Sequence, residues 1–166
     1  MNTFVIEEFF VEEKNACNFY TVRLIDRDNS ETDRFYDQFE QHNEYSEDFG
    51  MIHALIVELA DRGMQVIHRV RQESKAFAFP PKSLARDVQF DVFENNLRLY
   101  YVPVSEDIVI LLGGGIAHDS LTGKPSMALW DAQNFAKKIN SDGQEAFVIK
   151  GNKLFPAGDE DLITIY

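Results

Sequence analysis

The sequence predicts an α/β protein of the α+β type, in which a central antiparallel β-meander packs on helices and a β-hairpin is added at each end. Three observations carry this prediction. Residues 97–102 alternate like a strand with two different faces, and residues 108–112 contain no polar side chain, as expected of a central strand covered on both sides. Between residues 47 and 62, apolar side chains recur at intervals of three and four, which predicts a core-facing helix.

The first third of the chain is predicted to form a hairpin and two helices. Residues 4–11 and 19–25 are rich in Phe, Val, Tyr and Ile, which favours two antiparallel strands. Ser30 has the pattern of an N-cap, and a short helix is expected from there to near Tyr45. The second helix is expected over residues 47–62. Its predicted caps are Ser46 and Gly63, and its apolar stripe is Phe49, Ile52, Leu55, Ile56 and Leu59.

Three strands are predicted for the central meander, over residues 88–93, 97–102 and 108–112. In the middle strand, Arg98 and Tyr100 should share one face, while Leu97, Leu99 and Tyr101 share the other. The three glycines at 113–115 are expected to let the backbone leave the sheet. Residues 64–71 are ambiguous, and Pro80-Pro81 predicts an extended connection rather than a helix.

The C-terminal part is predicted to hold one helix, a hairpin and a last strand. Ser126 is the expected N-cap, and Lys137 and Lys138 would fall in the last turn. The expected inner face is Ala128, Ala132, Phe135, Ala136 and Ile139. Residues 146–150 and 153–155 should form a hairpin around Gly151-Asn152, and the terminal LITIY a strand. No linker interrupts the pattern, so residues 1–166 are predicted to form a single domain.

Composition points to a folded protein, with 45% apolar and 13% aromatic residues in 166. No stretch has the roughly 18 consecutive apolar residues of a membrane span, and the acidic N-terminus is unlike a secretory signal. The single cysteine excludes an internal disulfide and a cysteine-based zinc site, and the four histidines lack metal-binding spacing. We therefore expect a cytoplasmic protein without metal, cofactor or membrane contact.

Charge is unevenly distributed along this chain of net charge −12. Residues 1–48 hold 13 acidic and 4 basic side chains, whereas residues 62–86 hold six basic side chains and one acidic. The basic segment could dock a polyanion even though the protein as a whole is acidic. The candidate RNA-binding residues are Arg69, Arg71, Lys75, Lys82 and Arg86. A solvated loop whose cations only maintain solubility is the alternative.

Residues 30–139 resemble the RelE/ParE toxin superfamily, and most closely the phage-associated addiction module killer branch (HigB/RelE-like). The resemblance rests on the order of Leu59-Ala60 and Gly63, the strand Arg98-Leu99-Tyr100-Tyr101, the apolar strand with its glycines, and a final helix with inward alanines. It implies a bacterial, phage-derived cytoplasmic toxin of a type II toxin–antitoxin system, with a cognate antitoxin protein as partner. RelE-like members cut mRNA on the ribosome, and ParE-like members poison DNA gyrase.

The resemblance to the RelE-like branch implies a metal-independent endoribonuclease with Arg98, His118 and Lys124 as catalytic residues. Arg98 would hold the phosphate, His118 would move the proton, and Lys124 would neutralise the leaving oxygen. The arginine that such toxins carry in the strand before R-x-Y-Y is replaced at about Val92 or Phe93, which implies a weakened site. Arg98 could instead order the sheet through hydrogen bonds. A gyrase-binding protein, or a non-catalytic acidic interaction protein, remains the alternative.

Overall fold

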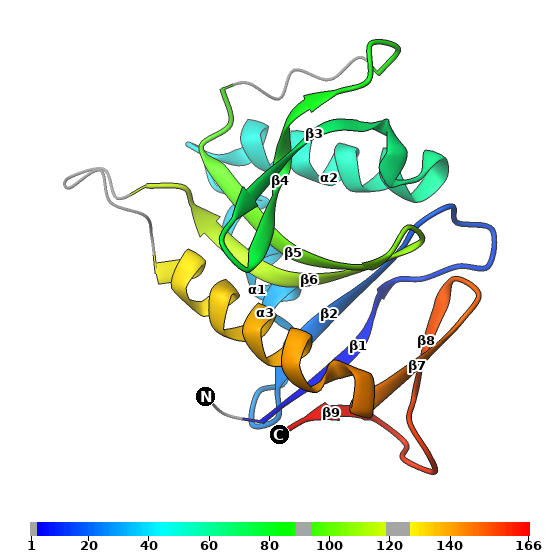
Figure 1. The fold of residues 1–166 in the computed structure, drawn as a ribbon. Coiled ribbons are helices and arrows are strands. Elements are labelled where there is room, and N and C mark those ends of the chain that lie inside the picture. The colour runs from blue at the N-terminus through cyan, green and yellow to red at the C-terminus, as the bar shows by residue number, and fades with distance from the viewer. Residues whose placement is uncertain (1–2, 89–93, 119–126) are drawn as a thin grey trace.

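The computed structural model describes residues 3–88, 94–118 and 127–166. It is a mixed α/β structure with one large sheet, as predicted (Figure 1). The helices are α1 Glu31–Phe39, α2 Ser46–Arg62 and α3 Met127–Ala146, and a 3-10 turn covers Met64–Val66. The strands are β1 Phe4–Phe10, β2 Asn18–Leu24, β3 Ile67–Glu73, β4 Ala76–Leu84, β5 Leu97–Ser105, β6 Ile108–Ile116, β7 Phe147–Lys150, β8 Lys153–Pro156 and β9 Ile163–Ile165.

Seven strands form the main sheet in the order β3-β4-β5-β6-β2-β1-β9. All neighbouring strands are antiparallel except β2 and β6, which run parallel. This parallel pair joins the N-terminal strands to the central strands of the sheet. The expected N-terminal hairpin is confirmed as β1–β2, and the terminal strand as β9 beside β1. The expected C-terminal hairpin is confirmed as the separate pair β7–β8.

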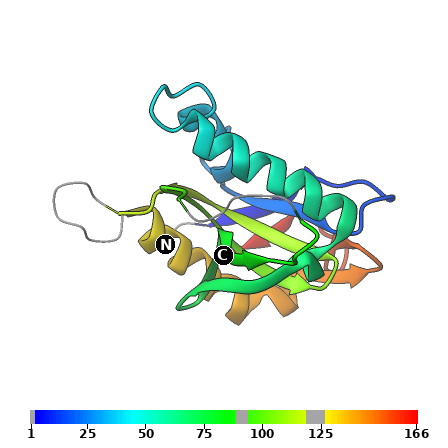
Figure 2. The same cartoon turned by 90° about the horizontal axis from the view of Figure 1, so that it is seen from above.

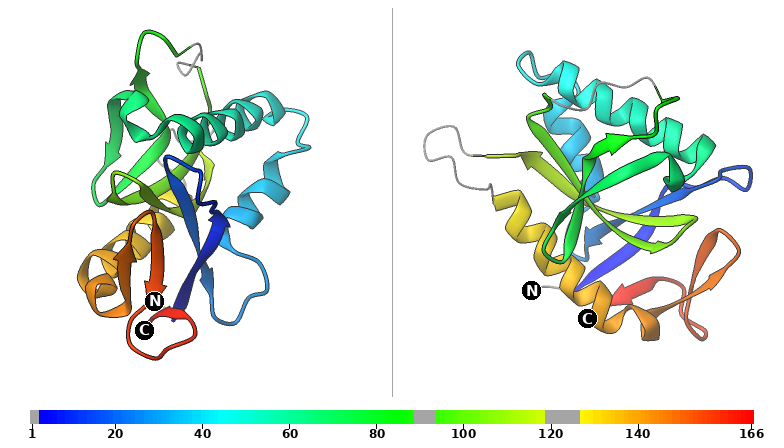
Figure 3. Two further views of the ribbon diagram at one scale, coloured as in Figure 1. Left: turned by 90° about the vertical axis from the view of Figure 1, so that its right-hand side faces the viewer. Right: turned by 45° about the horizontal axis from the view of Figure 1, so that its top comes forward.

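Helices cover both faces of the sheet, with α1 and α2 on one side and α3 on the other (Figures 2 and 3). The alternation predicted for β5 is confirmed, because Leu97, Leu99 and Tyr101 enter the core under α1 and α2, whereas Tyr100 packs on the α3 side. The predicted stripe of α2 is buried, and so is the stretch of β6 over residues 108–112. Each face therefore has its own apolar core.

The neighbour predicted for β5 was wrong, because β4 takes that place and pairs with β5 over residues 77–79. Val88 is outside any strand, and residues 89–93 lie outside the described part of the chain. The sequence did not predict β4 as a strand, because Pro80 and Pro81 have no N–H to donate to a neighbouring strand. Both prolines fall outside the paired positions of β4, in the gap where its pairing with β3 is interrupted.

The glycines at 113–115 do not end the sheet, contrary to the prediction, since β6 continues to Ile116. Two of them are needed for close approach inside the strand. A Cβ on Gly114 would collide with the carbonyl oxygen of Arg98. Gly113 has φ +82°, and its Cβ would lie 2.8 Å from the Cβ of Glu31 on α1. The glycines thus let β5 and α1 pack against the end of β6.

Three predicted helix ends were wrong. α1 stops at Phe39 rather than near Tyr45, because the next five residues are polar and offer nothing to bury. Tyr45, not Ser46, precedes α2, and its carbonyl accepts the first helical hydrogen bond from Phe49. α3 extends to Ala146, so Lys137 and Lys138 lie in its middle. The caps predicted at Ser30 and Gly63 are confirmed, whereas Ser126 lies outside the described residues.

Among the described residues, no helix is both long and apolar enough to traverse a lipid bilayer.

Candidate nucleic-acid interface

The five candidate RNA-binding residues come together on the β3–β4 hairpin. Arg69 and Arg71 lie on β3, Lys75 in the turn, Lys82 on β4, and Arg86 just beyond it. All are exposed except Arg71, which is half-buried. Because β3 is the edge strand of the sheet, its outer side has no neighbouring strand. The hairpin, which forms this edge of the sheet (Figure 1), therefore carries a row of exposed basic residues.

These cations are not neutralised within the described part of the chain, where no ion pair involves any of the five. Arg62, the first basic residue of the same segment, behaves differently. Its guanidinium lies 3.2 Å from Glu58 and 2.5 Å from Asp87, and these carboxylates raise its pKa. The positive charge left for a ligand is therefore that of the hairpin.

The register of the sheet aligns two arginines around one tyrosine. Arg71 pairs with Ala78, and Ala78 pairs with Tyr100, so the three side chains form a row on one face. Ala78 and Tyr100 belong to the α3-side core, which places Arg71 on that side. Arg98 is two residues before Tyr100 on β5 and shares its face. Ala78 is small, so nothing bulky stands between the strands at this point of the row.

Arg98 is half-buried, and burial lowers the pKa of its guanidinium. The positive charge of Arg71 lowers that pKa further, whereas the carboxylates of Glu73 and Asp48 act in the opposite direction. One nitrogen of Arg98, Nη1, donates to the carbonyl oxygens of Asn95 and Leu97, each at 2.8 Å. Arg98 therefore does order the loop before β5. Its remaining N–H groups have no acceptor among the described residues.

His118 lies at the same corner as Arg98. The ladder between β5 and β6 pairs Leu97 with Ile116, and the Ala117 N–H continues it with a bond of 2.8 Å to the Asn96 carbonyl. His118 follows directly and is exposed. The structure thus brings two of the three candidate catalytic residues to one end of the β5–β6 pair. Lys124, the third, lies outside the described residues, as does Asp119.

The two tyrosines of the R-x-Y-Y strand serve different faces, as the alternation predicted. Tyr101 stacks on Phe79 with ring centroids 4.1 Å apart and packs in the core under α2. Tyr100 faces the arginines. Burial and the charge of Glu73 raise the pKa of Tyr100, and Arg98 partly opposes them. Tyr100 is therefore a buried, neutral hydroxyl on the same face of the sheet as the two arginines.

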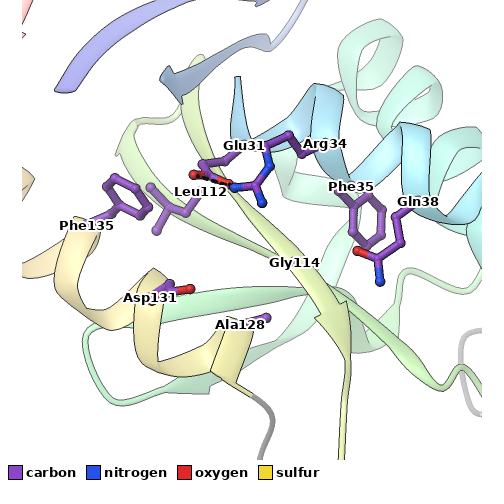
Figure 4. A pocket seen from close by; sticks show the side chains of 9 residues that line it. All are labelled: Glu31, Arg34, Phe35, Gln38, Leu112, Gly114, Ala128, Asp131 and Phe135. Atoms are coloured by element: carbon purple, nitrogen blue, oxygen red, sulfur yellow. Dashed lines mark hydrogen bonds and ion pairs between the residues drawn. The ribbon is translucent and has the colours of Figure 1, made fainter. Parts of the chain in front are cut away.

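A cavity of about 210 Å³, which no sequence pattern predicts, lies between α1, β6 and α3 (Figure 4). Glu31 and Asp131 line it from opposite helices. Glu31 accepts a hydrogen bond of 2.9 Å from Arg34, yet burial, helped by the charge of Asp131, raises its pKa. Gly114 of β6 lines the cavity beside Leu112.

A wider groove of about 660 Å³ separates the β3–β4 turn from the first half of α3. Sequence reasoning missed this groove as well. Trp130 and Met127 line it with 65% and 73% of their surface exposed. The predicted inner face of α3 is correct over Ala132, Phe135, Ala136 and Ile139. Trp130 was the available signal, as a large aromatic residue off that inner face.

Comparison with protein-family models, with curated proteins and with solved structures found no significant match. No group of three or more His, Cys, Asp or Glu side chains within residues 3–88, 94–118 and 127–166 is arranged to hold a metal ion. The polar groups that the structure gathers at this site are its arginines, its histidine and its tyrosine. These groups bind anions and move protons.

Proposed function

We propose that this protein is the toxin component of a type II toxin–antitoxin pair and that it acts on RNA as a weak, metal-independent endoribonuclease. The observation that carries the proposal is the placement of Arg71 and Arg98 on one face of the sheet, beside Tyr100 and at the foot of a basic hairpin. Neither guanidinium forms an ion pair within the described residues, and guanidinium groups bind phosphate with matched geometry.

The order of elements supports the same proposal. Between Glu31 and Ala146 the chain runs through two helices, a meander, a central apolar strand with glycines and a last helix. This is the order on which the resemblance to the RelE/ParE toxins rests. The β1–β2 hairpin, the extra strand β3 and the C-terminal β7–β9 are additions to it.

Arg71 also offers a substitute for the arginine expected at Val92 or Phe93. The row from Arg71 through Ala78 to Tyr100 carries a guanidinium to the required face from one strand further out. Arg71 is held there because its Nε donates to the carbonyl of Pro80 at 2.9 Å. The proposed site thus keeps two cations near the phosphate, although one comes from a different strand.

In this mechanism the RNA 2′-hydroxyl attacks the adjacent phosphate and displaces the 5′-oxygen of the next nucleotide. His118 takes up the 2′-hydroxyl proton, Arg71 and Arg98 stabilise the charge that develops on the phosphate oxygens, and Lys124 neutralises the leaving oxygen. Because Nη1 of Arg98 donates to two backbone carbonyls, Arg98 has fewer N–H groups left for the phosphate than a free arginine. Weak cleavage follows from that arrangement.

The test is induced expression in bacteria, with growth and mRNA integrity followed in parallel. We expect growth arrest with cut mRNA in the wild type, and relief by His118→Ala, Lys124→Ala and Arg71→Ala. Loss of one electrostatic donor should slow cleavage by about 10²–10³-fold. His42→Ala, an exposed histidine in the α1–α2 loop, is the matched control and should leave the arrest unchanged. Intact mRNA in arrested wild-type cells would contradict the ribonuclease.

The use of Arg98 for backbone hydrogen bonds also favours a second candidate, a toxin-like protein that binds its target without cutting RNA. Arrest with intact mRNA and inhibited DNA supercoiling would identify gyrase as that target. Absence of arrest, with no RNA binding at low salt, would leave the acidic interaction protein, whose binding surface is within residues 1–48.

A further inference from the structure

The groove between the β3–β4 turn and α3 is a ready-made surface rather than a loose gap. The side-chain amide of Gln133 on α3 fixes the turn from both sides. Its Oε1 accepts from the Lys75 N–H at 2.8 Å, and its Nε2 donates to the carbonyl of Glu73. The turn is therefore tied to the helix by two hydrogen bonds at one side of the groove.

The floor and the rim of this groove differ in character. Met127, Leu129 and Trp130 give it an apolar, aromatic floor, and Trp130 is 65% exposed. The charged residues that line it are Lys75 and Lys137, both exposed and both positive. Asp131, the nearest carboxylate along α3, faces the other cavity (Figure 4). An exposed tryptophan in a groove that also holds two cations fits an anionic ligand that carries flat apolar groups.

The groove is also continuous with the basic hairpin. Lys75 lies in the turn that follows Arg71 on β3, so the cations of the hairpin extend to the groove. Glu73 interrupts this run, but its carboxylate acts on Arg98 and Tyr100, on the sheet. A chain of phosphates could therefore pass from Arg71 to Lys75 and Lys137 along one side of the molecule.

We propose that this groove binds single-stranded RNA, with one unpaired base stacked on Trp130 and the flanking phosphates on Lys75 and Lys137. The proposal rests on the proposed function and names its substrate form. Aromatic side chains inside a positive groove are the common means of holding unpaired bases, since every base has a π-face. Base-paired RNA could not stack on Trp130, because its bases are already covered.

Trp130 is the single tryptophan of the chain, so its fluorescence reports directly on the groove. Titration with ten-nucleotide oligouridylate or oligoadenylate should quench that fluorescence to saturation, and a duplex of the two should not. Binding of labelled RNA, followed by anisotropy, should weaken about tenfold or more in Trp130→Ala and much less in Trp130→Phe, which keeps a ring. Tyr166→Ala, which removes an aromatic residue 77% exposed elsewhere, is the control.

The lysines should act through charge. Lys75→Ala with Lys137→Ala should lower affinity and reduce the slope of log affinity against log salt by about 1.4, because two phosphates are no longer neutralised. RNA binding without quenching, or equal binding by Trp130→Ala, overturns the proposal. Quenching by polyglutamate instead of RNA also overturns it and assigns the groove to an acidic polypeptide. Quenching by RNA in a protein that never cuts mRNA supports this inference while the ribonuclease fails.

Discussion

The strands β6 and β3 belong to one sheet and differ in almost every respect. β6 lies between β5 and β2, and its residues 108–112 are buried. β3 is the edge strand, has one neighbour, and buries none of its seven residues fully. The first strand has a uniformly apolar sequence, and the second mixes cations with apolar residues. Buried apolar surface therefore lies at the centre of this sheet, and exposed positive charge at its edge.

The largest expected effect is at the centre. Replacing Leu111 of β6, which is fully buried, by Ala should lower the free energy of unfolding by about 2–5 kcal/mol through lost transfer energy and the cavity left behind. Val70→Ala on β3 truncates a side chain that is 45% exposed. It should change the free energy of unfolding by no more than about 0.5 kcal/mol. Urea denaturation of both variants measures this difference. Equal losses of unfolding free energy in the two variants would contradict the contrast between centre and edge.

The same contrast explains how much the sequence could predict. An apolar run such as that of β6 has one physical solution, burial on both faces, and it was predicted correctly. In β3, His68, Arg69 and Arg71 obscure the alternation, because an edge strand needs no consistent buried face. β4 was missed for another reason. Pro80 and Pro81 argue against a strand unless they fall at positions where the strand makes no backbone hydrogen bonds to its neighbours.

The site was predictable only in part. The basic residues of the hairpin could be found by charge, and Arg98 by its strand. The proximity of Arg71 and Arg98 depends on the pairing register of three strands, which no local pattern encodes. The groove depends on how the turn docks on α3 through Gln133, whose hydrogen-bond partners are 58 or more positions away in the chain.

A second prediction concerns the glycines of β6. Gly114→Ala should destabilise the protein by about 1–3 kcal/mol, because the new Cβ would meet the Arg98 carbonyl and force β5 away from β6. Gly50→Ala is the matched control, since that glycine lies in α2 and an added Cβ would have nothing within 4 Å. It should stabilise by about 0.4–1 kcal/mol. Thermal unfolding distinguishes the opposite signs, and a neutral Gly114→Ala would contradict the close approach.

At the edge strand β3, substitutions of charged residues should change RNA binding more than they change the stability of the fold. Arg69→Ala with Arg71→Ala should reduce the salt dependence of single-stranded RNA binding, by about 0.7 in log–log slope for each phosphate that is no longer neutralised. The same change to Lys14 and Lys150, two exposed lysines outside the hairpin, should leave the slope intact. Anisotropy at several salt concentrations measures both. An unchanged slope in the arginine variant would mean that the hairpin is only a solvated edge.

The smallest expected effect is at Glu31, on α1 against the end of β6, and its sign follows from burial. Because burial raises its pKa above the ordinary value of 4.5, the folded state binds this proton more tightly than the unfolded chain does. The stabilisation is complete below that ordinary value and is lost as pH rises through the raised pKa. Glu31→Gln should therefore reduce the change in the free energy of unfolding with pH by a few tenths of a kcal/mol. Near neutral pH the variant should be as stable as the wild type or more stable. Asp131→Asn should reduce the same dependence by a smaller amount, because its charge contributes to the shift. Urea denaturation between pH 4 and pH 8 gives the comparison. A Glu31→Gln protein that falls further below the wild type as pH rises would show that the ion pairs with Arg27 and Arg34 outweigh burial.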